Sequence, residues 1–530
     1  MDSNVPVAPP SGKNGNQEAT TAQPAPVHGA VLHADRIAKN TSYLTVALIF
    51  QKVISLVYFV YISRTVGPQN VGYYLSAIAV TTVLGFFIDL NFSQALIRET
   101  AKKPEKTNEY LNAAVTIKCF TAVLAYAVAL LYVHLFHLPA IVQSLVVITG
   151  LIMILDSLTL SFYSIFRGHQ KLQYEAIGTI VNKIIVTTFG VIGLRLGYGV
   201  HLLVLAILAG SAFNLVYVGI LLFRKLQWRP RLRGVYDDVR YLAKIVVPWF
   251  ALGGIFVTIY GYIDQVLLSN PLLVGARGAS YLSWYGTAYK LTFAFQFLPA
   301  AVVAAFFPAM SAYFISDKEK LKTTFERSLS YLLILSVPLS LGIYTLADRI
   351  ILSLYTRAYT ASIFPLQILI LSIVFIFLNY PVGYLLNAAD RQRRNTIHVG
   401  IAMVVNILLN LFLIPRFTFV GAAISSTISS VLLVTLGLIV AKRIVAFRSW
   451  PLLVTALKTV VAAGTMAVGL WYLKHRSGLF TLIPLAVLWY FVVLLLLRGI
   501  RISDGVSLYQ SVKRKVVHVH DDETRPVSHS

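Results

Sequence analysis

Long hydrophobic runs alternate with short polar gaps along most of this 530-residue chain. A helix needs about 20 consecutive apolar residues to cross a hydrocarbon core about 30 Å thick. Runs of that length predict fourteen transmembrane helices, near residues 41–63, 73–96, 113–135, 141–165, 176–194, 200–223, 242–269, 281–308, 329–347, 364–388, 395–415, 419–441, 452–473 and 479–497. The pattern therefore predicts an all-α polytopic membrane protein.

Composition supports this fold class. Hydrophobic residues make up 57% of the chain and charged residues 12%, whereas a soluble domain carries about 25% charged residues. Residues 1–35 are polar and have no apolar core, which predicts a disordered tail and not a cleavable signal peptide. Residues 499–530 form a second tail, which is basic and polar.

Lysine and arginine predict the orientation of the helices. If the N-terminus lies inside, the inner segments hold 31 of these residues, the outer loops 8 and the spans 6. Such a bias is typical of cytoplasmic loops, so we expect a multi-pass protein of the cytoplasmic membrane with both termini in the cytoplasm. This distribution also explains the net charge of +24 without a nucleic-acid partner.

A weak internal repeat with an offset near 222 divides the chain. Gln170 and Gly178 stand eight residues apart, as do Gln392 and Gly400, and each pair spans a basic turn before the next helix. Both copies start on the same side, so the repeat is parallel, with an axis along the membrane normal. It predicts an N-lobe, a basic linker, a C-lobe and two extra C-terminal helices, at residues 36–223, 224–241, 242–445 and 446–498.

Nine charged residues fall within the predicted spans, and seven of them are candidates for ion pairing, coupling or a cavity. A charge at that depth costs about 2.5–3.5 kcal/mol and normally faces the protein interior or a watery cavity. We interpret Asp89, Asp156 and Lys118 as members of ion pairs or as groups that take part in ion or proton coupling. A cationic cavity is the interpretation for Lys52, Lys183 and Lys290, with Asp264 nearby. Because lysine is a point charge suited to phosphate, such a cavity predicts an anionic, phosphate-bearing substrate.

Sites for other chemistry are not evident. The single cysteine, Cys119, excludes a disulfide framework or a thiolate metal site. His518 and His520 are interpreted as part of a solvated tail, and no nucleophile, phosphate-loop or zinc motif is present. We therefore expect a non-enzyme with no cofactor or metal, and a basic linker that lies on anionic lipid headgroups.

The chain resembles the oligosaccharide flippases (the Wzx type) of the multidrug/oligosaccharidyl-lipid/polysaccharide exporter superfamily over roughly residues 36–445. The resemblance rests on these segments in this order: RTVGPQNVGYY (64–74), IDLNFSQALIRE (88–99), FRGHQKLQYEAI (166–177), YIDQVLLS (262–269), WYGTAYKL (284–291), FFPAMS (306–311), LNAADRQRRN (386–395) and NLFLIPRFTFVGAA (410–423). One departure is Asn91, where these proteins often carry glycine.

The resemblance implies two six-helix lobes that form a V-shaped, alternately opening cleft, with two peripheral helices. It implies that Lys52, Asp264 and Lys290 lie on helices bounding the cleft. It also implies a polyprenyl-pyrophosphate-linked glycan as substrate, turned from the cytoplasmic to the outer leaflet.

Alternatives remain open at this stage. Within the superfamily they are a peptidoglycan-precursor flippase and a drug or cation antiporter, although a basic cavity would repel cationic drugs. A membrane glycan polymerase or ligase is disfavoured because the predicted outer loops are short. Coupling to H⁺ or Na⁺, the glycan, polysaccharide-assembly partners and the oligomeric state are not decided by the sequence, and a monomer is our expectation.

Overall fold

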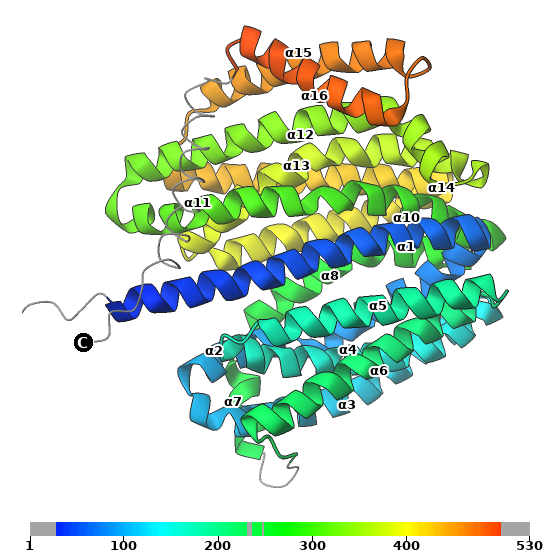
Figure 1. The fold of residues 1–530 in the computed structure, drawn as a ribbon, viewed down its shortest axis with the longest axis vertical. Coiled ribbons are helices and arrows are strands. Elements are labelled where there is room, and N and C mark those ends of the chain that lie inside the picture. The colour runs from blue at the N-terminus through cyan, green and yellow to red at the C-terminus, as the bar shows by residue number, and fades with distance from the viewer. Residues whose placement is uncertain (1–27, 231–235, 246–247, 500–530) are drawn as a thin grey trace, which may run out of the picture.

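The computed structural model describes residues 28–230, 236–245 and 248–499 (Figure 1). Within these ranges every regular element is a helix. The α-helices are α1 (His28–Asp89), α2 (Phe92–Lys102), α3 (Thr107–Leu135), α4 (Ala140–Gly168), α5 (Gln173–Arg195), α6 (Val200–Leu226), α7 (Tyr236–Ile245), α8 (Pro248–Ser269), α9 (Pro271–Val274), α10 (Gly278–Phe293), α11 (Phe297–Ser316), α12 (Lys318–Leu354), α13 (Ile363–Ala388), α14 (Gln392–Val445), α15 (Ser449–Leu473) and α16 (Leu479–Leu496). The predicted all-α class is confirmed.

Two of these helices are too long for a single crossing. Of the described residues, twelve stretches are long and apolar enough to span a membrane. However, α1 has 62 residues and α14 has 54, which at 1.5 Å per residue is about 93 Å and 81 Å. Each is broken by non-helical backbone, at Gly67 (φ 76°) and at Thr418 (φ 51°). Counting both halves of each gives the fourteen predicted transmembrane segments.

Just after the second break, at Thr418, the chain packs closely against itself at Gly421. A Cβ on Gly421 would lie 2.4 Å from the carbonyl oxygen of Leu413, so a larger residue would clash with the preceding segment. We call the end of the bundle with the Gly67 and Thr418 breaks the kink end, and the end with α2 and α7 the basic end. Figure 1 shows these two ends at opposite sides of the molecule.

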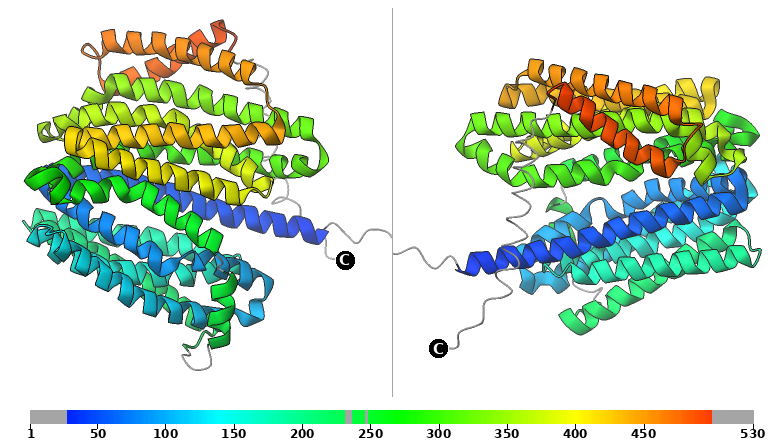
Figure 2. Two further views of the ribbon diagram at one scale, coloured as in Figure 1. Left: turned by 180° about the vertical axis from the view of Figure 1, so that it is seen from behind. Right: turned by 45° about the horizontal axis from the view of Figure 1, so that its top comes forward.

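The helices form two groups with α1 between them (Figures 1 and 2). On the N-lobe side, α1 packs against α4 and α5, while α6 packs against both of these helices. On the C-lobe side, α1 packs against α8 and α10, and the pairs α8–α14, α12–α13 and α13–α14 pack extensively. Residues of both groups share one buried hydrophobic cluster, which includes Ile62, Val204, Leu282 and Leu366.

Three predicted spans are not continuous helices. The span at 73–96 crosses the turn between α1 and α2, and the span at 242–269 begins with the last residues of α7. The run at 281–308 is divided between α10 and α11 by a 3₁₀ turn at Ala294–Gln296. The hydrophobic pattern alone does not reveal this break, because Gln296 is a single polar residue in an otherwise apolar run.

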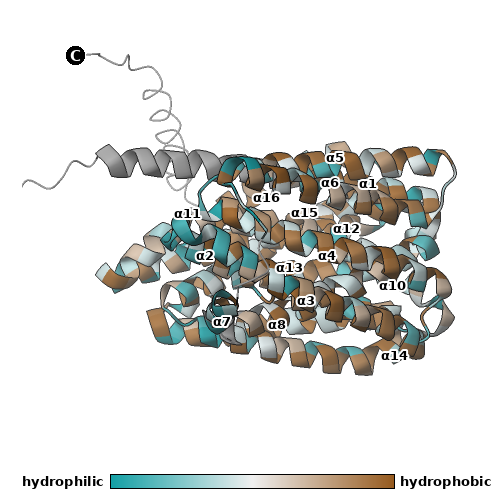
Figure 3. Cartoon of the chain, turned by 90° about the horizontal axis from the view of Figure 1, so that it is seen from below, coloured by the Kyte–Doolittle hydropathy of each residue, from teal (hydrophilic) through white to brown (hydrophobic). Residues whose placement is uncertain are grey.

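Two short amphipathic helices, α2 and α7, lie at the basic end, where Figure 3 shows hydrophilic residues gathered. The predicted basic linker contains most of α7. One residue before α7 and one residue within it contact the N-lobe. Trp228 Nε1 donates to Asn112 Oδ1 at 3.1 Å, and the Tyr241 ring stacks on Tyr110 with centroids 5.9 Å apart. Part of the predicted N-terminal tail is also helical, because α1 begins at His28; the rest of both tails, with His518 and His520, lies outside the described residues.

The two C-terminal helices pack on the outer edge of the C-lobe (Figure 2). Their main neighbour is α12. Lys474 Nζ pairs with Asp348 Oδ2 at 2.9 Å, and Tyr490 donates its hydroxyl to the carbonyl oxygen of Ile334 at 2.8 Å.

The two basic turns that suggested a repeat end their helices in the same way. Lys171 N donates to Phe166 O, and Arg391 N to Leu386 O, each at 2.8 Å. These equivalent bonds are 220 residues apart, two fewer than the offset taken from the glutamines. The pseudo-twofold axis itself stays a prediction.

Candidate functional site

The first half of α1 carries two adjacent aromatic residues, Tyr58 and Phe59, which are both buried. Consecutive helix residues point about 100° apart, so the two rings meet different neighbours. Lys183 of α5 places Nζ 5.8 Å from the Tyr58 ring centre, and Lys290 of α10 places Nζ 4.0 Å from the Phe59 ring centre. Two of the three lysines predicted for a cavity thus meet at one turn of α1, one from each helix group.

Both lysines lie deep in the bundle. Lys183 is ten residues, or about 15 Å, along α5 from Gln173 at the basic end. Lys290 is twelve residues, or about 18 Å, along α10 from Gly278 at the kink end. These depths are close to the middle of a hydrocarbon core about 30 Å thick.

Neither ammonium group is neutralised by an acid in the described part of the chain, where the salt bridges involve other residues. Both side chains are partly exposed, and the positive charge of Lys183 acts on Lys290. The aromatic faces offset part of the cost of depth, since a cation–π contact contributes about 0.5–2 kcal/mol. The result is a partly exposed positive site that no described carboxylate neutralises.

Lys52 lies on the same helix but outside this pair. It precedes Phe59 by seven residues, which puts it about 10 Å closer to the basic end. Its side chain is exposed, and no described acid forms a salt bridge with it. The structure therefore places Lys52 on the helix that the other two lysines share, without a contact to them.

Asp264 does not join the lysines but is enclosed in the C-lobe, where it is 3% exposed. Its Oδ1 accepts from Asn410 Nδ2 at 2.6 Å, and its Oδ2 accepts from Tyr285 at 2.5 Å and from the Ser426 hydroxyl. Asn410 also donates to Asn406 Oδ1 at 3.1 Å. Three helices, α8, α10 and α14, supply this Asp264 cluster.

The Asp264 cluster is rich in oxygen and poor in charge. Asn410 Oδ1 is buried without a hydrogen-bond partner, and the described residues hold no group of three His, Cys, Asp or Glu. Hard cations prefer oxygen ligands, and one carboxylate balances one positive charge. The cluster is therefore suited to Na⁺ or to a proton on Asp264.

Asp89 and Lys118 form an ion pair in the N-lobe, with Nζ 2.5 Å from Oδ1. Ser93 donates to the same carboxylate oxygen at 2.5 Å, and Lys118 Nζ donates to the Ser157 carbonyl oxygen at 2.8 Å. Because removing one partner of such a pair leaves a buried charge, these contacts fix the meeting point of α1, α2, α3 and α4.

Asp156 behaves differently from Asp89. Its side chain is exposed and hydrogen-bonds with Ser211 of α6. It forms no salt bridge with Lys118, whose described carboxylate partner is Asp89. Asp156 is thus a solvent-reachable acid in the middle of the N-lobe.

The sequence reasoning missed the neutral partners at both sites. Asn406 and Asn410 stand four residues apart in an apolar helix, so they occupy one face, and that spacing was an available signal. Tyr58 and Phe59 gave no signal, because aromatic residues are common in membrane helices and nothing in their spacing indicates a lysine partner.

Comparison with known proteins agrees with this architecture. The family model described as "Polysaccharide biosynthesis protein" matches residues 37–314, and the one described as "MatE" matches 251–412. The "Probable low-salt glycan biosynthesis flippase Agl15" of Haloferax volcanii is 21% identical over 74% of this chain and 81% of its own length. The "Probable lipid II flippase MurJ" of Haemophilus influenzae is 27% identical over 48% of this chain and 50% of its own length.

A solved structure has the same fold. The one titled "Lipid II flippase MurJ, inward closed conformation" covers 87% of this chain and 99% of its own, with a TM-score of 0.69 and 15% identity. The family match spans more than half of the sequence, and the fold, the helix count and the relatives point the same way. The chain belongs to the polysaccharide biosynthesis protein family and is a flippase, not an enzyme, of the multidrug/oligosaccharidyl-lipid/polysaccharide exporter superfamily.

Proposed function

We propose that this flippase moves a polyprenyl-pyrophosphate-linked oligosaccharide to the outer leaflet of the cytoplasmic membrane for surface glycan assembly. The observation that carries the proposal is the meeting of Lys183 and Lys290 at Tyr58 and Phe59. Two lysines without acidic partners are suited to a pyrophosphate, because an ammonium group pairs with phosphate as a point charge. The glycan flippase named among the relatives supports the same substrate class.

The proposed mechanism is alternating access between the two lobes. Phosphates and sugar hydroxyls would lose their water in the hydrocarbon core at a large cost, and the lysine pair replaces part of that hydration. The lipid tail stays in the bilayer throughout. The basic end faces the cytoplasm in this proposal, because cytoplasmic loops carry the excess of lysine and arginine.

We infer that the Asp264 cluster binds the coupling ion, either H⁺ or Na⁺. Its carboxylate and its unpartnered Asn410 oxygen support this assignment. A cation bound there would act on α8, α10 and α14 together, and α10 also carries Lys290. Ion binding and the position of one substrate lysine are thereby linked through a single helix.

The lysine pair is tested by replacing Lys183 or Lys290 with Ala in cells that need this protein for surface glycan. Each change removes one charged phosphate contact, and export is expected to fall about tenfold or more, as is usual for a charge-assisted hydrogen bond. Surface glycan is measured against the amount of inserted protein.

A matched control is Lys458→Ala. Lys458 also lies in a predicted span, but on α15 at the edge, where it donates to the Arg498 carbonyl oxygen. Its replacement is expected to leave export unchanged. Normal export by the Lys183→Ala, Lys290→Ala double variant would rule out the lysine pair as the phosphate site.

A second candidate is a flippase for the peptidoglycan precursor, favoured by the Haemophilus influenzae relative named a lipid II flippase. Complementation separates the two candidates: growth of a strain lacking its cell-wall precursor flippase supports the second, and restored surface oligosaccharide supports the first. A drug antiporter is disfavoured, because Lys183 and Lys290 would repel a cationic substrate.

A further inference from the structure

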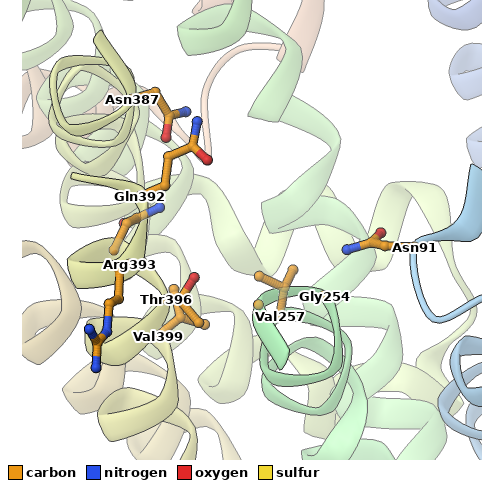
Figure 4. Close-up of a pocket in the computed structure, with 10 residues that line it drawn as sticks. Asn91, Gly254, Val257, Asn387, Gln392, Arg393, Thr396 and Val399 are labelled. Carbon is orange, nitrogen blue, oxygen red and sulfur yellow. The ribbon is translucent and has the colours of Figure 1, made fainter. Parts of the chain in front are cut away.

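A pocket of about 300 Å³ lies at the basic end, between the lobes (Figure 4), and neither Lys183 nor Lys290 lines it. One wall belongs to the N-lobe and consists of Asn91, in the turn between α1 and α2. The opposite wall is the turn from α13 to α14, and the backbone of Gly253 and Gly254 on α8 lies between them. Neither the proposed phosphate site nor the ion site uses these residues.

The lining of the pocket combines polar side chains with apolar surface from Val257 and Val399, and none of its residues is an acid. Its side chains include four carboxamides, on Asn91, Asn387, Gln392 and Asn395, together with the Arg393 guanidinium and a threonine hydroxyl. A carboxamide both donates and accepts hydrogen bonds, and so does each hydroxyl of a sugar. Without an acid the pocket has no negative charge to balance a cation, and it contains Arg393, so its chemistry matches a neutral polyhydroxylated group instead.

The fold places Asn91 in this wall. The residue has left-handed backbone (φ 63°), and its side chain does not cap α2. A Cβ on Gly254 would lie 2.7 Å from Asn91 Nδ2 and 2.3 Å from the Phe86 ring, so a larger residue here would have to displace one of these side chains. In Figure 4 the Asn91 amide points toward Gly254 across the space between the lobes.

The facing wall is set by a tight turn. Asp390 is left-handed (φ 54°), and Arg391 N donates to Leu386 O, which ends α13 and starts α14 within a few residues. As a result Asn387 at the end of α13 lies beside Gln392 at the start of α14 (Figure 4). Asn387 and Gln392 are both exposed, so a ligand can reach them.

We propose that this pocket binds one sugar of the lipid-linked glycan through its hydroxyl groups and that binding favours closure of the basic end. The inference rests on the proposed function. The volume is at the lower limit of ligand pockets, about 300–1,000 Å³, which fits one sugar and not the whole oligosaccharide. Because Asn91 and the α13–α14 turn belong to different lobes, a sugar that contacts both stabilises the conformation in which they face each other.

The experiment measures sugar binding without transport. In a Cys119→Ser background, Val257→Cys places a thiol on the pocket wall, where Val257 is 57% exposed. The rate of maleimide labelling of the full chain is followed with glucose, N-acetylglucosamine, glucuronic acid or inorganic phosphate. At least one sugar is expected to slow labelling, and Asn91→Ala is expected to weaken that protection about fivefold, the usual effect of losing one hydrogen bond.

Asn108→Ala is the matched control, because Asn108 is exposed at the basic end on α3 and does not line the pocket. It is expected to leave protection unchanged. The inference is overturned if no sugar slows labelling, if Asn91→Ala is protected as well as the parent, or if phosphate alone protects equally, which would make Arg393 a simple anion site.

The result is separable from the proposed function. Adding Lys290→Ala to the Val257→Cys protein is expected to abolish export, while the sugars still slow maleimide labelling of the cysteine. Sugar protection in a protein that exports no glycan would contradict the proposed function alone. Lysine-dependent export without sugar protection would contradict only the pocket.

Discussion

The buried charges of this protein differ in what surrounds them. Lys183 and Lys290 face aromatic rings, Lys118 faces Asp89, and Asp264 faces neutral hydrogen-bond donors. The sequence predicted the depth of each charge, because depth follows from position in an apolar run. It did not predict the partners, because they come from helices far apart in the chain; Asp264 and Asn410, for example, are 146 residues apart.

Asp264→Asn tests the ion site at this scale. The amide keeps the shape of the side chain but removes the negative charge that a bound H⁺ or Na⁺ would balance. Glycan export in vesicles is expected to lose its dependence on an imposed ion gradient and to fall to the rate measured without one.

Asp156→Asn is the comparison variant, since Asp156 is an exposed acid of the N-lobe. It is expected to keep the ion dependence. If Asp156→Asn removes that dependence and Asp264→Asn does not, the coupling site belongs to the N-lobe and the assignment to the C-lobe is wrong.

At the scale of elements, glycines determine how closely helices of the two lobes approach. A Cβ on Gly72 of α1 would lie 1.8 Å from the carbonyl oxygen of Ala279 on α10, so the two backbones touch near the kink end. Gly254 permits a similar approach at the basic end. The sequence predicted the helices that carry these glycines but not the contacts, because a glycine in an apolar run has many possible neighbours.

Gly72→Val is expected to hold the kink end open, because its side chain would occupy the space of the Ala279 backbone. Ser283 on α10 is buried and serves as the reporter position. When Ser283→Cys is combined with Gly72→Val in the Cys119→Ser background, the new cysteine is expected to become reactive toward an impermeant maleimide added from outside. Gly464→Val on α15 is the control, since nothing lies within 4 Å of its Cβ position. Equal reactivity in the two variants would argue against Gly72 as a closure contact.

At the scale of the whole molecule, the hydrophobic pattern predicted the number of helices, and the resemblance implied two lobes. The breaks at Gly67 and Thr418 coincide with predicted loops. The pattern could not predict that α7 docks on the N-lobe, because Trp228 and Tyr241 find their partners only in three dimensions. Nor could it indicate the pocket at Asn91, which exists only where two lobes meet.

A cross-link tests whether the lobes must separate at the kink end. Leu75 Cγ lies 3.9 Å from the Cβ position of Gly286, which is close enough for cysteines at these positions to form a disulfide. The double variant Leu75→Cys, Gly286→Cys is made in the Cys119→Ser background. Oxidation of its two cysteines to a disulfide is expected to stop export, and a reductant is expected to restore export. Each single cysteine variant is the control. Export that continues in the fully cross-linked protein would contradict alternating access at this interface.

Within the described part of the chain no acid forms a salt bridge with Lys183 or Lys290, and this has a consequence for competition between anions. Two positive charges without a counter-ion attract any small anion, including the free phosphate and nucleotides of the cell. A substrate held in the membrane by its lipid, however, is confined to a thin layer, and its effective concentration there is far higher than its average in the cell. If the lysine pair is the phosphate site proposed above, the lipid anchor gives the substrate an advantage over soluble anions that no counter-ion has to provide.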